Sequence, residues 1–359
     1  MLRNYQIYLL GTFALLAGSW AMLSGCHSST TPPPVVAPPS FAVTPLTANK
    51  ATYGAANIDT NLQDAWGLSF STTSKGYPWI ADRASGVTTV YDSLGDRQTI
   101  LYHVNGPGGV KGSPTGIVPV PTGMFPFDGS EATWIFSQLN GTIAGVIGGQ
   151  IDSTSILAHF PNSSYTGLAL VTSGTAGPQL YVPNIQNGSL DIFAPGFTSR
   201  NQHGEQSTEQ GFTPFNAVLI DTQLIVTSAR METVAGQPFV ATGPYNVTSN
   251  GGFVDIYDIN GKYERTLITN DSLNSPWGVA IAPSNFGSYS GDLLVGNFGD
   301  GTIHAYNRST GALLGTLNGA SGPITIPGLW ALVVYNGTLY YTAGPNNGAD
   351  GVFGAITVK

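Results

Sequence analysis

The feature that most constrains the fold is an internal repeat of about 50 residues that runs through most of the chain. Most units open with a small or aromatic residue beside glycine, followed by an apolar run. The openings are Trp66-Gly67-Leu68, Thr115-Gly116-Ile117, Thr166-Gly167-Leu168, Phe215-Asn216-Ala217, Trp277-Gly278-Val279 and Leu329-Trp330-Ala331. Repeats of this length are typical of propellers and solenoids, in which one unit cannot bury its apolar face alone.

Each unit contains further strands. A second apolar strand is expected at 79–81, 134–136, 180–182, 224–226, 293–295 and 339–341. In five units a polar turn that ends in glycine follows, at Ser85-Gly86, Asn140-Gly141, Asn187-Gly188, Asp300-Gly301 and Asp350-Gly351. Such pairs suit the positive φ of tight hairpins. Third strands that alternate in polarity are expected at 87–91, 142–146, 189–193, 253–257, 302–306 and 352–356.

Six units of this kind predict an all-β fold, a six-bladed β-propeller over residues 46–359. The last unit stops after its third strand, so its outer strand is expected from the N-terminal segment 41–47. That pairing would close the ring and leave no end blade unpaired. The alternative is an open β-solenoid, which would need polar caps that neither end of the repeat region shows.

The N-terminus has the layout of an export signal over residues 1–25. Arg3 precedes an apolar run at 7–23, and Leu23-Ser24-Gly25-Cys26 resembles the lipobox of bacterial lipoproteins. The resemblance implies cleavage before Cys26 and lipidation of this cysteine, the only one in the chain. The alternatives are an uncleaved anchor and an ordinary secretory signal. Residues 26–45, rich in Pro, Ser and Thr, are expected to be a tether.

These features predict a lipid-anchored protein of the bacterial cell envelope, with the membrane as its first partner. His27 stands where some inner-membrane lipoproteins carry Asp, which favours the outer membrane and leaves the periplasmic or surface face open. The net charge is −8 and no cluster of Lys or Arg occurs, which excludes nucleic acid as an expected partner.

The unit that contains Ser275-Pro276-Trp277-Gly278-Val279, Gly291-Asp292-Leu293-Leu294-Val295 and Gly301-Thr302-Ile303-His304 resembles an NHL repeat. The whole region from about 45 to 357 resembles an uncharacterised family of exported bacterial propellers, some of which end in PEP-CTERM sorting tails. The matching stretches are 64–68, 114–117, 214–216, 294–301 and 328–332. This resemblance implies the fold and export, and it implies no activity.

Propellers commonly place their sites at the mouth of the axial channel, where the inner strands begin. The candidates for ligand contact are Asp64, Trp66, Asn216, Asn274, Trp277 and Trp330, with Thr115 and Thr166 in the same ring. The functional interpretation is a shallow pocket with an aromatic rim for a protein, a glycan or a small organic molecule. The structural alternative is that each Trp before Gly packs between blades.

A second function class is a metal-dependent lactonase or esterase. Six-bladed hydrolases of the gluconolactonase and paraoxonase type hold Ca²⁺ on Glu, Asn and Asp at the starts of the inner strands. At the matching positions of this chain only Asn216 keeps such a side chain, so the sequence predicts no cofactor and leaves calcium at Asn216 as the alternative. The leading prediction is a binding module, and a purely structural envelope protein is the third.

Two further features of the repeat are a recurrent polar position and one insertion. Polar residues follow the second strands at Asp82, Gln138, Asn184, Asn297 and Asn346, which indicates turn chemistry more than a functional ring. The fourth unit carries an insertion at 230–252, whose role as a functional or a plain surface loop stays open.

Overall fold

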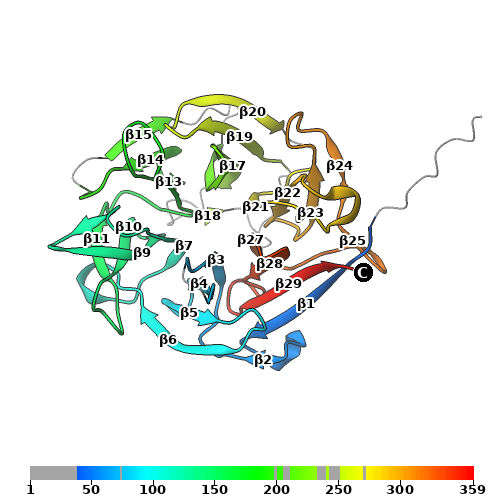
Figure 1. Ribbon diagram of the computed structural model, residues 1–359, viewed down its shortest axis with the longest axis horizontal. Coiled ribbons are helices and arrows are strands. Elements are labelled where there is room, and N and C mark those ends of the chain that lie inside the picture. The colour runs from blue at the N-terminus through cyan, green and yellow to red at the C-terminus, as the bar shows by residue number, and fades with distance from the viewer. Residues whose placement is uncertain are drawn as a thin grey trace, which may run out of the picture. The chain divides into compact units, whose positions relative to one another are not determined.

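Six mainly antiparallel sheets stand around a common axis, one for each repeat unit (Figure 1). The computed structural model describes residues 39–72, 75–197, 200–204, 211–232, 240–241, 251–269 and 272–359. The inner strands are β3 (Ala65–Phe70), β7 (Pro114–Pro119), β12 (Ala169–Val171), β16 (Phe212–Ile220), β21 (Pro276–Ile281) and β27 (Leu329–Tyr335). The predicted six-bladed β-propeller is therefore confirmed.

Each inner strand is followed outward by three more. The second strands are β4 (Pro78–Asp82), β9 (Ser130–Gln138), β13 (Gln179–Asn184), β17 (Gln223–Glu232), β22 (Leu293–Asn297) and β28 (Thr338–Ala343). The third strands are β5 (Val87–Tyr91), β10 (Thr142–Ile147), β14 (Ser189–Phe193), β19 (Phe253–Asp258), β23 (Ile303–Tyr306) and β29 (Val352–Val358). The outer strands are β6 (Arg97–His103), β11 (Ser155–His159), β15 (Arg200–Gly204), β20 (Tyr263–Thr269), β24 (Leu313–Thr316) and β1 (Phe41–Ala48).

The remaining elements are short. They are β2 (Asn57–Ile58), β8 (Pro126–Phe127), β18 (Val240–Ala241), β25 (Asn318–Gly319), β26 (Gly322–Pro323) and three 3₁₀ turns at Ala51–Tyr53, Pro107–Gly109 and Gly287–Tyr289. Among the described residues, no helix has the length and apolar character to cross a bilayer. Residues 1–38 lie outside the described residues, and with them Cys26 and the predicted signal. Most of the predicted insertion, 233–239 and 242–250, also lies outside them.

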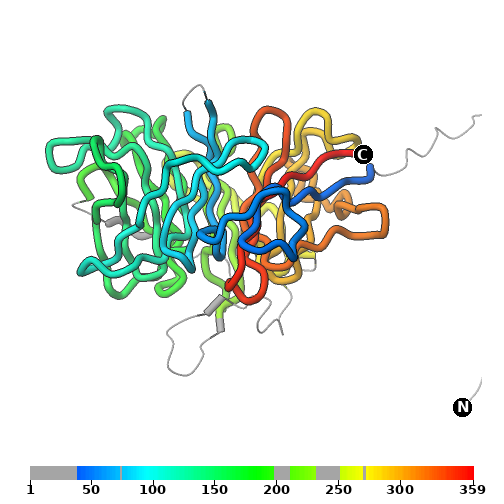
Figure 2. The backbone as a smooth tube through the Cα atoms, turned by 90° about the horizontal axis from the view of Figure 1, so that it is seen from below, coloured from blue at the N-terminus to red at the C-terminus, as the bar shows by residue number. Residues whose placement is uncertain are grey.

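The N-terminal strand closes the ring as the sequence predicts. β1 pairs antiparallel with β29, from Phe41 opposite Val358 to Ala48 opposite Val352. Figure 2 shows this blue strand alongside the red C-terminal strand. The strand begins at Phe41, within the range assigned to the tether. The ring is closed, so the open solenoid is wrong.

Two contacts fix the closing strand. The ring of Phe41 is 1% exposed and lies 4.6 Å from the ring of Phe286 and 6.2 Å from that of Tyr289, both in the fifth blade. At the other end of β1, the backbone N–H of Asn49 donates to the carbonyl of Gly351 (3.1 Å), and the N–H of Gly351 donates to Oδ1 of Asn49 (3.2 Å). The side-chain amide of Asn49 also donates to Asp350 (2.9 Å). The closing strand is therefore anchored by apolar burial at one end and by a polar cluster at the other.

Asp350 is the centre of that polar cluster. Its carboxylate also accepts hydrogen bonds from Tyr53 (2.7 Å) and Asn346 (3.1 Å), and it pairs with Lys50 (2.7 Å). Burial alone would raise the pKa of Asp350, but the hydrogen bonds from Lys50, Asn49, Tyr53 and Asn346 outweigh it and lower the pKa to about 2. The side chain therefore stays charged at neutral pH and links the segment after β1 to the turn between β28 and β29.

Five of the six inner strands carry a β-bulge near their start. One extra residue faces the second strand between Ala65 and Leu68 in β3, and the other bulges lie at 114–117, 214–216, 276–278 and 329–332. Neighbouring blades touch at these bulges. A Cβ on Gly67 would lie 2.5 Å from the carbonyl oxygen of Thr115, and one on Gly278 would lie 2.5 Å from that of Trp330. Glycine at these positions allows the inner strands to meet around the axis.

The predicted hairpin turns are confirmed in four blades, and the turn predicted for the sixth blade is wrong. The turn glycines Gly86, Gly141, Gly188 and Gly301 have φ between 61° and 74°. In the last blade Gly351 does not have a positive φ. Instead Asn346, Asn347 and Gly348 adopt φ values of 53°, 58° and 71°. Asn is one of the few residues that tolerate this conformation, so the Asn-Asn-Gly run makes the turn.

Candidate functional site

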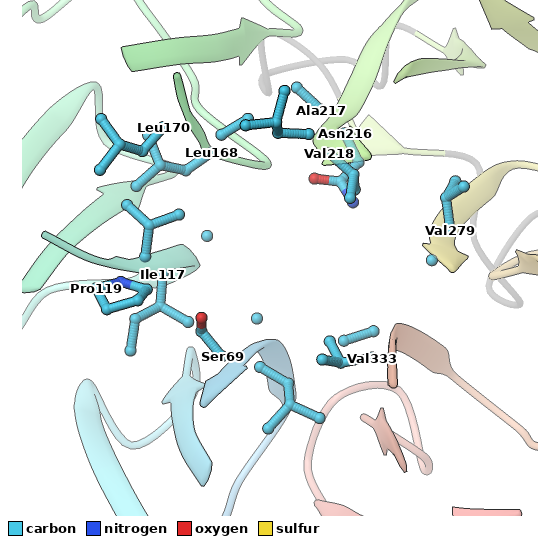
Figure 3. Close-up of a pocket in the computed structure, with 18 of the residues that line it drawn as sticks. Ser69, Ile117, Pro119, Leu168, Leu170, Asn216, Ala217, Val218, Val279 and Val333 are labelled. Carbon is cyan, nitrogen blue, oxygen red and sulfur yellow. The ribbon is translucent and has the colours of Figure 1, made fainter. Parts of the chain in front are cut away.

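A cavity of about 440 Å³ lies on the axis, between the inner strands of all six blades (Figure 3). The side chains labelled in Figure 3 come from every blade: Ser69, Ile117, Pro119, Leu168, Leu170, Asn216, Ala217, Val218, Val279 and Val333. A volume of this size is within the range of small-molecule sites. The cavity is therefore the leading candidate for a binding site in the described part of the chain.

The cavity wall is aliphatic and uncharged. Its larger side chains are Leu68, Ile117, Val118, Leu168, Leu170, Val218, Leu219, Val279, Leu332 and Val333. Among the described residues that line it, none has an ionisable side chain. The polar side chains in the wall are Ser69, Thr72, Thr172 and Asn216. Such a wall excludes a charged ligand, because a charge placed there would lose its hydration without a partner.

The cavity opens where the inner strands end. Thr72, Pro121 and Thr172 line it and are exposed to solvent, whereas Ile117 and Val279, nearer the strand starts, are buried. A second hollow of about 420 Å³ adjoins this mouth on blades four to six. It shares Val218, Leu219, Val279, Leu332 and Val333 with the first and adds Ile220, Ala280, Ile281, Ala282, Pro283 and Val334. The apolar surface therefore spreads outward over one half of the mouth.

The other end of the axis is closed by a layer of aromatic side chains. Trp66 stacks on Trp330 with ring centroids 3.7 Å apart, and Phe298 stacks on the other side of Trp330 at 3.8 Å. Trp277 meets both indoles edge-on at 5.8–6.3 Å. Phe215 packs against Trp330 at 5.9 Å. All five are at most 5% exposed, so they form a floor beneath the cavity.

Contacts between blades that are not neighbours place this aromatic layer on the axis. Trp66 of the first blade meets Trp277 of the fifth. The indole N–H of Trp277 donates to the carbonyl of Thr166 at the start of the third blade (3.0 Å). Between the neighbouring fourth and fifth blades, Asn216 donates to the carbonyl of Trp277 (2.8 Å). These hydrogen bonds therefore join the blades to one another at the floor.

A buried carboxylate lies beside the floor. Asp64 is 2% exposed, pairs with Arg83, and accepts a hydrogen bond from the indole N–H of Trp330 (3.2 Å). Burial raises the pKa of Asp64, while the charge and hydrogen bond of Arg83 and the hydrogen bond from the Trp330 indole N–H oppose that rise. Asp64 also has φ 51°, an uncommon value for a residue other than glycine.

The structure brings most of the predicted site residues together, but as buried groups. Asp64, Trp66, Asn216, Asn274, Trp277 and Trp330 are 2–8% exposed, and Thr115 and Thr166 are fully buried. The indoles do not form an open rim. They close this end of the channel, as the packing alternative expects. Asn216 and Trp277 also line the cavity, which extends from them along the inner strands.

Sequence reasoning missed two parts of this arrangement. Phe298 follows directly after Asn297 of the recurrent polar positions, and Ile185 follows Asn184 in the same way. Both belong to the buried cluster of the floor. An apolar residue follows three of the five polar positions, Gln138, Asn184 and Asn297, and this was a signal available in the sequence. The aliphatic mouth at the strand ends was also missed, because alternation along a strand does not show where a channel widens.

The recurrent polar positions are structural. Asp82, Gln138, Asn184 and Asn297 are fully buried. Three of them accept a hydrogen bond from a backbone N–H ahead of an inner strand: Gln138 from Ser113, Asn184 from Ser164 and Asn297 from Asn274 (2.9–3.1 Å). In the sixth blade Asn346 donates to Asp350. In three blades these bonds tie the end of the second strand to the segment that enters the inner strand, so the role is structural but is cross-strand bonding and not the predicted local turn chemistry.

The residues around Asn216 do not fit a calcium ion. Its amide N–H₂ is committed to the Trp277 carbonyl, and its Oδ1 faces the backbone of Gly167 so closely that a Cβ there would lie 2.2 Å away. Ca²⁺ takes six to eight oxygen ligands that include carboxylates. The cavity wall supplies no carboxylate. Within the described ranges, no three His, Cys, Asp or Glu side chains gather as a metal site.

The chain has relatives among uncharacterised viral proteins. No protein-family model matches it. One protein of Acanthamoeba polyphaga mimivirus is 27% identical over 326 residues, which cover 87% of this chain and 78% of the relative. Another from the same virus is 24% identical over 317 residues, 84% of this chain and 82% of the relative. Membership of the exported bacterial family stays a prediction.

Solved structures show the same fold. An auxiliary nutrient binding protein from Bacteroides ovatus has a TM-score of 0.55 at 9% identity, over 89% of this chain and 77% of that one. Virginiamycin B lyase from Staphylococcus aureus has a TM-score of 0.49 at 12% identity, over 89% of this chain and all of that one. At these identities the likeness is one of fold alone.

Proposed function

We propose that this chain is a lipid-anchored binding module of the bacterial cell envelope whose ligand enters the axial cavity. The observation that carries the proposal is the cavity itself: about 440 Å³, open at one end, floored by tryptophan and lined without a charge. General acid–base or nucleophilic catalysis needs an ionisable or activated side chain within reach of the substrate. The described wall offers none, whereas an uncharged ligand would find an apolar surface.

Anchoring is the second half of the proposal and is supported by the sequence alone. The motif Leu23-Ser24-Gly25-Cys26 precedes a Pro-rich segment that could hold the propeller away from a bilayer. Feeding bacterial cells that express the chain an alkyne fatty acid should label the wild type and not Cys26→Ser. Equal labelling of both, or none of either, would contradict a lipid on this cysteine. The outer membrane is the expected location, and the net charge of −8 disfavours nucleic acid.

Binding in the cavity can be tested on the unit Pro38–Lys359, which holds all six blades and the strand that closes them. Uncharged compounds would be screened by thermal shift against the wild type and Leu170→Asp. Leu170 lies half-buried in the cavity wall, so the carboxylate would occupy the ligand's space. We expect stabilisation of the wild type that the variant loses. Hits that stabilise both equally would place binding outside the cavity and contradict the proposal.

A hydrolase is the alternative, favoured only by the predicted resemblance of Asn216 to a calcium ligand. It requires lactone or ester hydrolysis that saturates with substrate and is abolished both by a chelator and by Asn216→Ala. We expect no turnover above that of a buffer control. Saturable turnover with both sensitivities would overturn the binding proposal in favour of the enzyme.

A further inference from the structure

We infer that the axial cavity binds the aliphatic chain of a single-chain, uncharged amphiphile, whose polar end stays at the mouth. This inference rests on the proposed function and names its ligand class. Three features of the cavity carry it: its aliphatic wall on all sides, its blind end, and the uneven distribution of polar groups at its mouth.

The wall favours a chain over a polar ligand. Each of the six inner strands contributes at least one Leu, Ile or Val to it, so an occupant meets hydrocarbon in every direction. A sugar or peptide backbone buried here would leave its hydrogen-bonding groups without partners, at a cost of several kcal/mol in an apolar medium. A methylene chain has no such groups and gains from leaving water.

The length of the wall also suits a chain. The lining runs from Gly67 to Thr72 on the first blade and from Gly116 to Pro121 on the second, five residue steps on each. At about 3.3 Å per step these two blades line about 17 Å of the channel, whereas the lining on the fifth and sixth blades, 277–279 and 331–333, spans about 7 Å. Its inner end is closed by Trp277 and the aromatic layer behind it. A chain would therefore be accepted up to a fixed length.

The mouth distinguishes the two ends of the ligand. Hydroxyl groups of Ser69, Thr72 and Thr172 line it on the first and third blades. On blades four to six the adjoining hollow continues the hydrocarbon surface through Ile220 and Ile281. A hydroxylated head group would contact the hydroxyl groups on the first and third blades. An anionic head group is disfavoured because the described lining carries no cation and the net charge of the protein is negative.

The test is a series of monoglycerides whose acyl chains run from hexanoyl to hexadecanoyl. Each is titrated into Pro38–Lys359 below the concentration at which it aggregates. Binding is read from tryptophan fluorescence, because Trp277 lines the cavity. We expect the affinity to rise about fourfold for each added methylene and then to stop rising once the chain fills the cavity. A rise that never levels off would indicate adsorption to the outer surface and overturn the inference.

Two variants and one control locate the binding. Leu170→Asp should lose at least tenfold in affinity, while Leu314→Asp should lose nothing, because Leu314 is 45% exposed on the outer strand β24. Val118→Phe adds volume to the wall and stays apolar, so it should move the plateau to a shorter chain. An unchanged plateau in a folded Val118→Phe would overturn the inference.

The outcomes separate this inference from the function on which it rests. If no monoglyceride binds but another uncharged compound does, and Leu170→Asp abolishes that binding, the amphiphile is wrong and the binding cavity stands. If amphiphiles bind the wild type and Leu170→Asp equally well, both are wrong. Circular dichroism of each variant shows that it is folded before its affinity is compared.

Discussion

Replacing Phe41 with alanine tests whether the N-terminal strand is an integral part of the sixth blade. The ring of Phe41 is 1% exposed and packs on Phe286 and Tyr289 of the fifth blade. Truncating a buried Phe to Ala typically costs about 3–5 kcal/mol, from lost transfer free energy and the cavity left behind. Phe41 is the first residue of its strand, where the chain can move to fill part of the space, so we expect about 3 kcal/mol.

The assay is urea unfolding of Pro38–Lys359, followed by circular dichroism and by tryptophan fluorescence. The matched control is Val43→Ala on the same strand, a half-buried side chain that packs against the same cluster. It should cost about 1 kcal/mol. A cost for Phe41→Ala no larger than that of the control would refute the reasoning, because β1 would then contribute little to the closed ring.

Three further predictions concern the ring and its buried charges. Gly278→Ala should cost about 1–3 kcal/mol by calorimetry, since its Cβ would meet backbone, whereas Gly148→Ala, whose Cβ would make only an ordinary contact with the Ser130 hydroxyl (3.4 Å), should cost under about 1 kcal/mol; equal costs would contradict close contact between blades. Asp350 has a folded pKa of about 2, below its usual value of about 4, so its contribution to stability is complete above about pH 4 and is lost as the pH falls towards 2. Asp350→Asn should flatten that part of the acid-unfolding curve, and an unchanged curve would refute this role. Arg83→Met should cost about 3–5 kcal/mol at neutral pH by leaving Asp64 buried and unpaired, and adding Asp64→Asn should recover most of it; no recovery would contradict the pairing.

The sequence was sufficient for the blade count and the closing strand because both follow from repetition. The unit length predicts a propeller, and a last unit without a fourth strand predicts that another segment supplies it. The prediction of the turn in the sixth blade was wrong because that blade contains two turn-forming runs, Asn346-Asn347-Gly348 and Asp350-Gly351. Both suit a hairpin, and only the hydrogen-bond register selects between them.

The site could be predicted in part. The sequence identified Trp66, Trp277 and Trp330 as a group at the starts of the inner strands, and the structure places them in contact. Their direction could not be predicted, because a β-bulge at each start turns the side chain onto the axis, and an extra residue is visible only in the pairing of two strands. The three tryptophans, which the sequence predicted to lie at the mouth of the channel, therefore form the floor of the cavity.

The aliphatic cavity was beyond sequence reasoning for a related physical reason. Val118, Leu170 and Val333 look like ordinary strand residues, and nothing in their spacing shows that they face a channel instead of a neighbouring blade. The distinction depends on how far the strands diverge from the axis, which six blades determine together.

The central claim is that ligands bind on the axis above the tryptophan floor. Its most direct test is a crystal structure of Pro38–Lys359 with a monoglyceride brominated at the end of its acyl chain. We predict an anomalous bromine peak inside the cavity, between Ile117, Val279 and Leu332 and next to Trp277. A peak on the outer strands, or at the Asp64–Arg83 end of the axis, would contradict it.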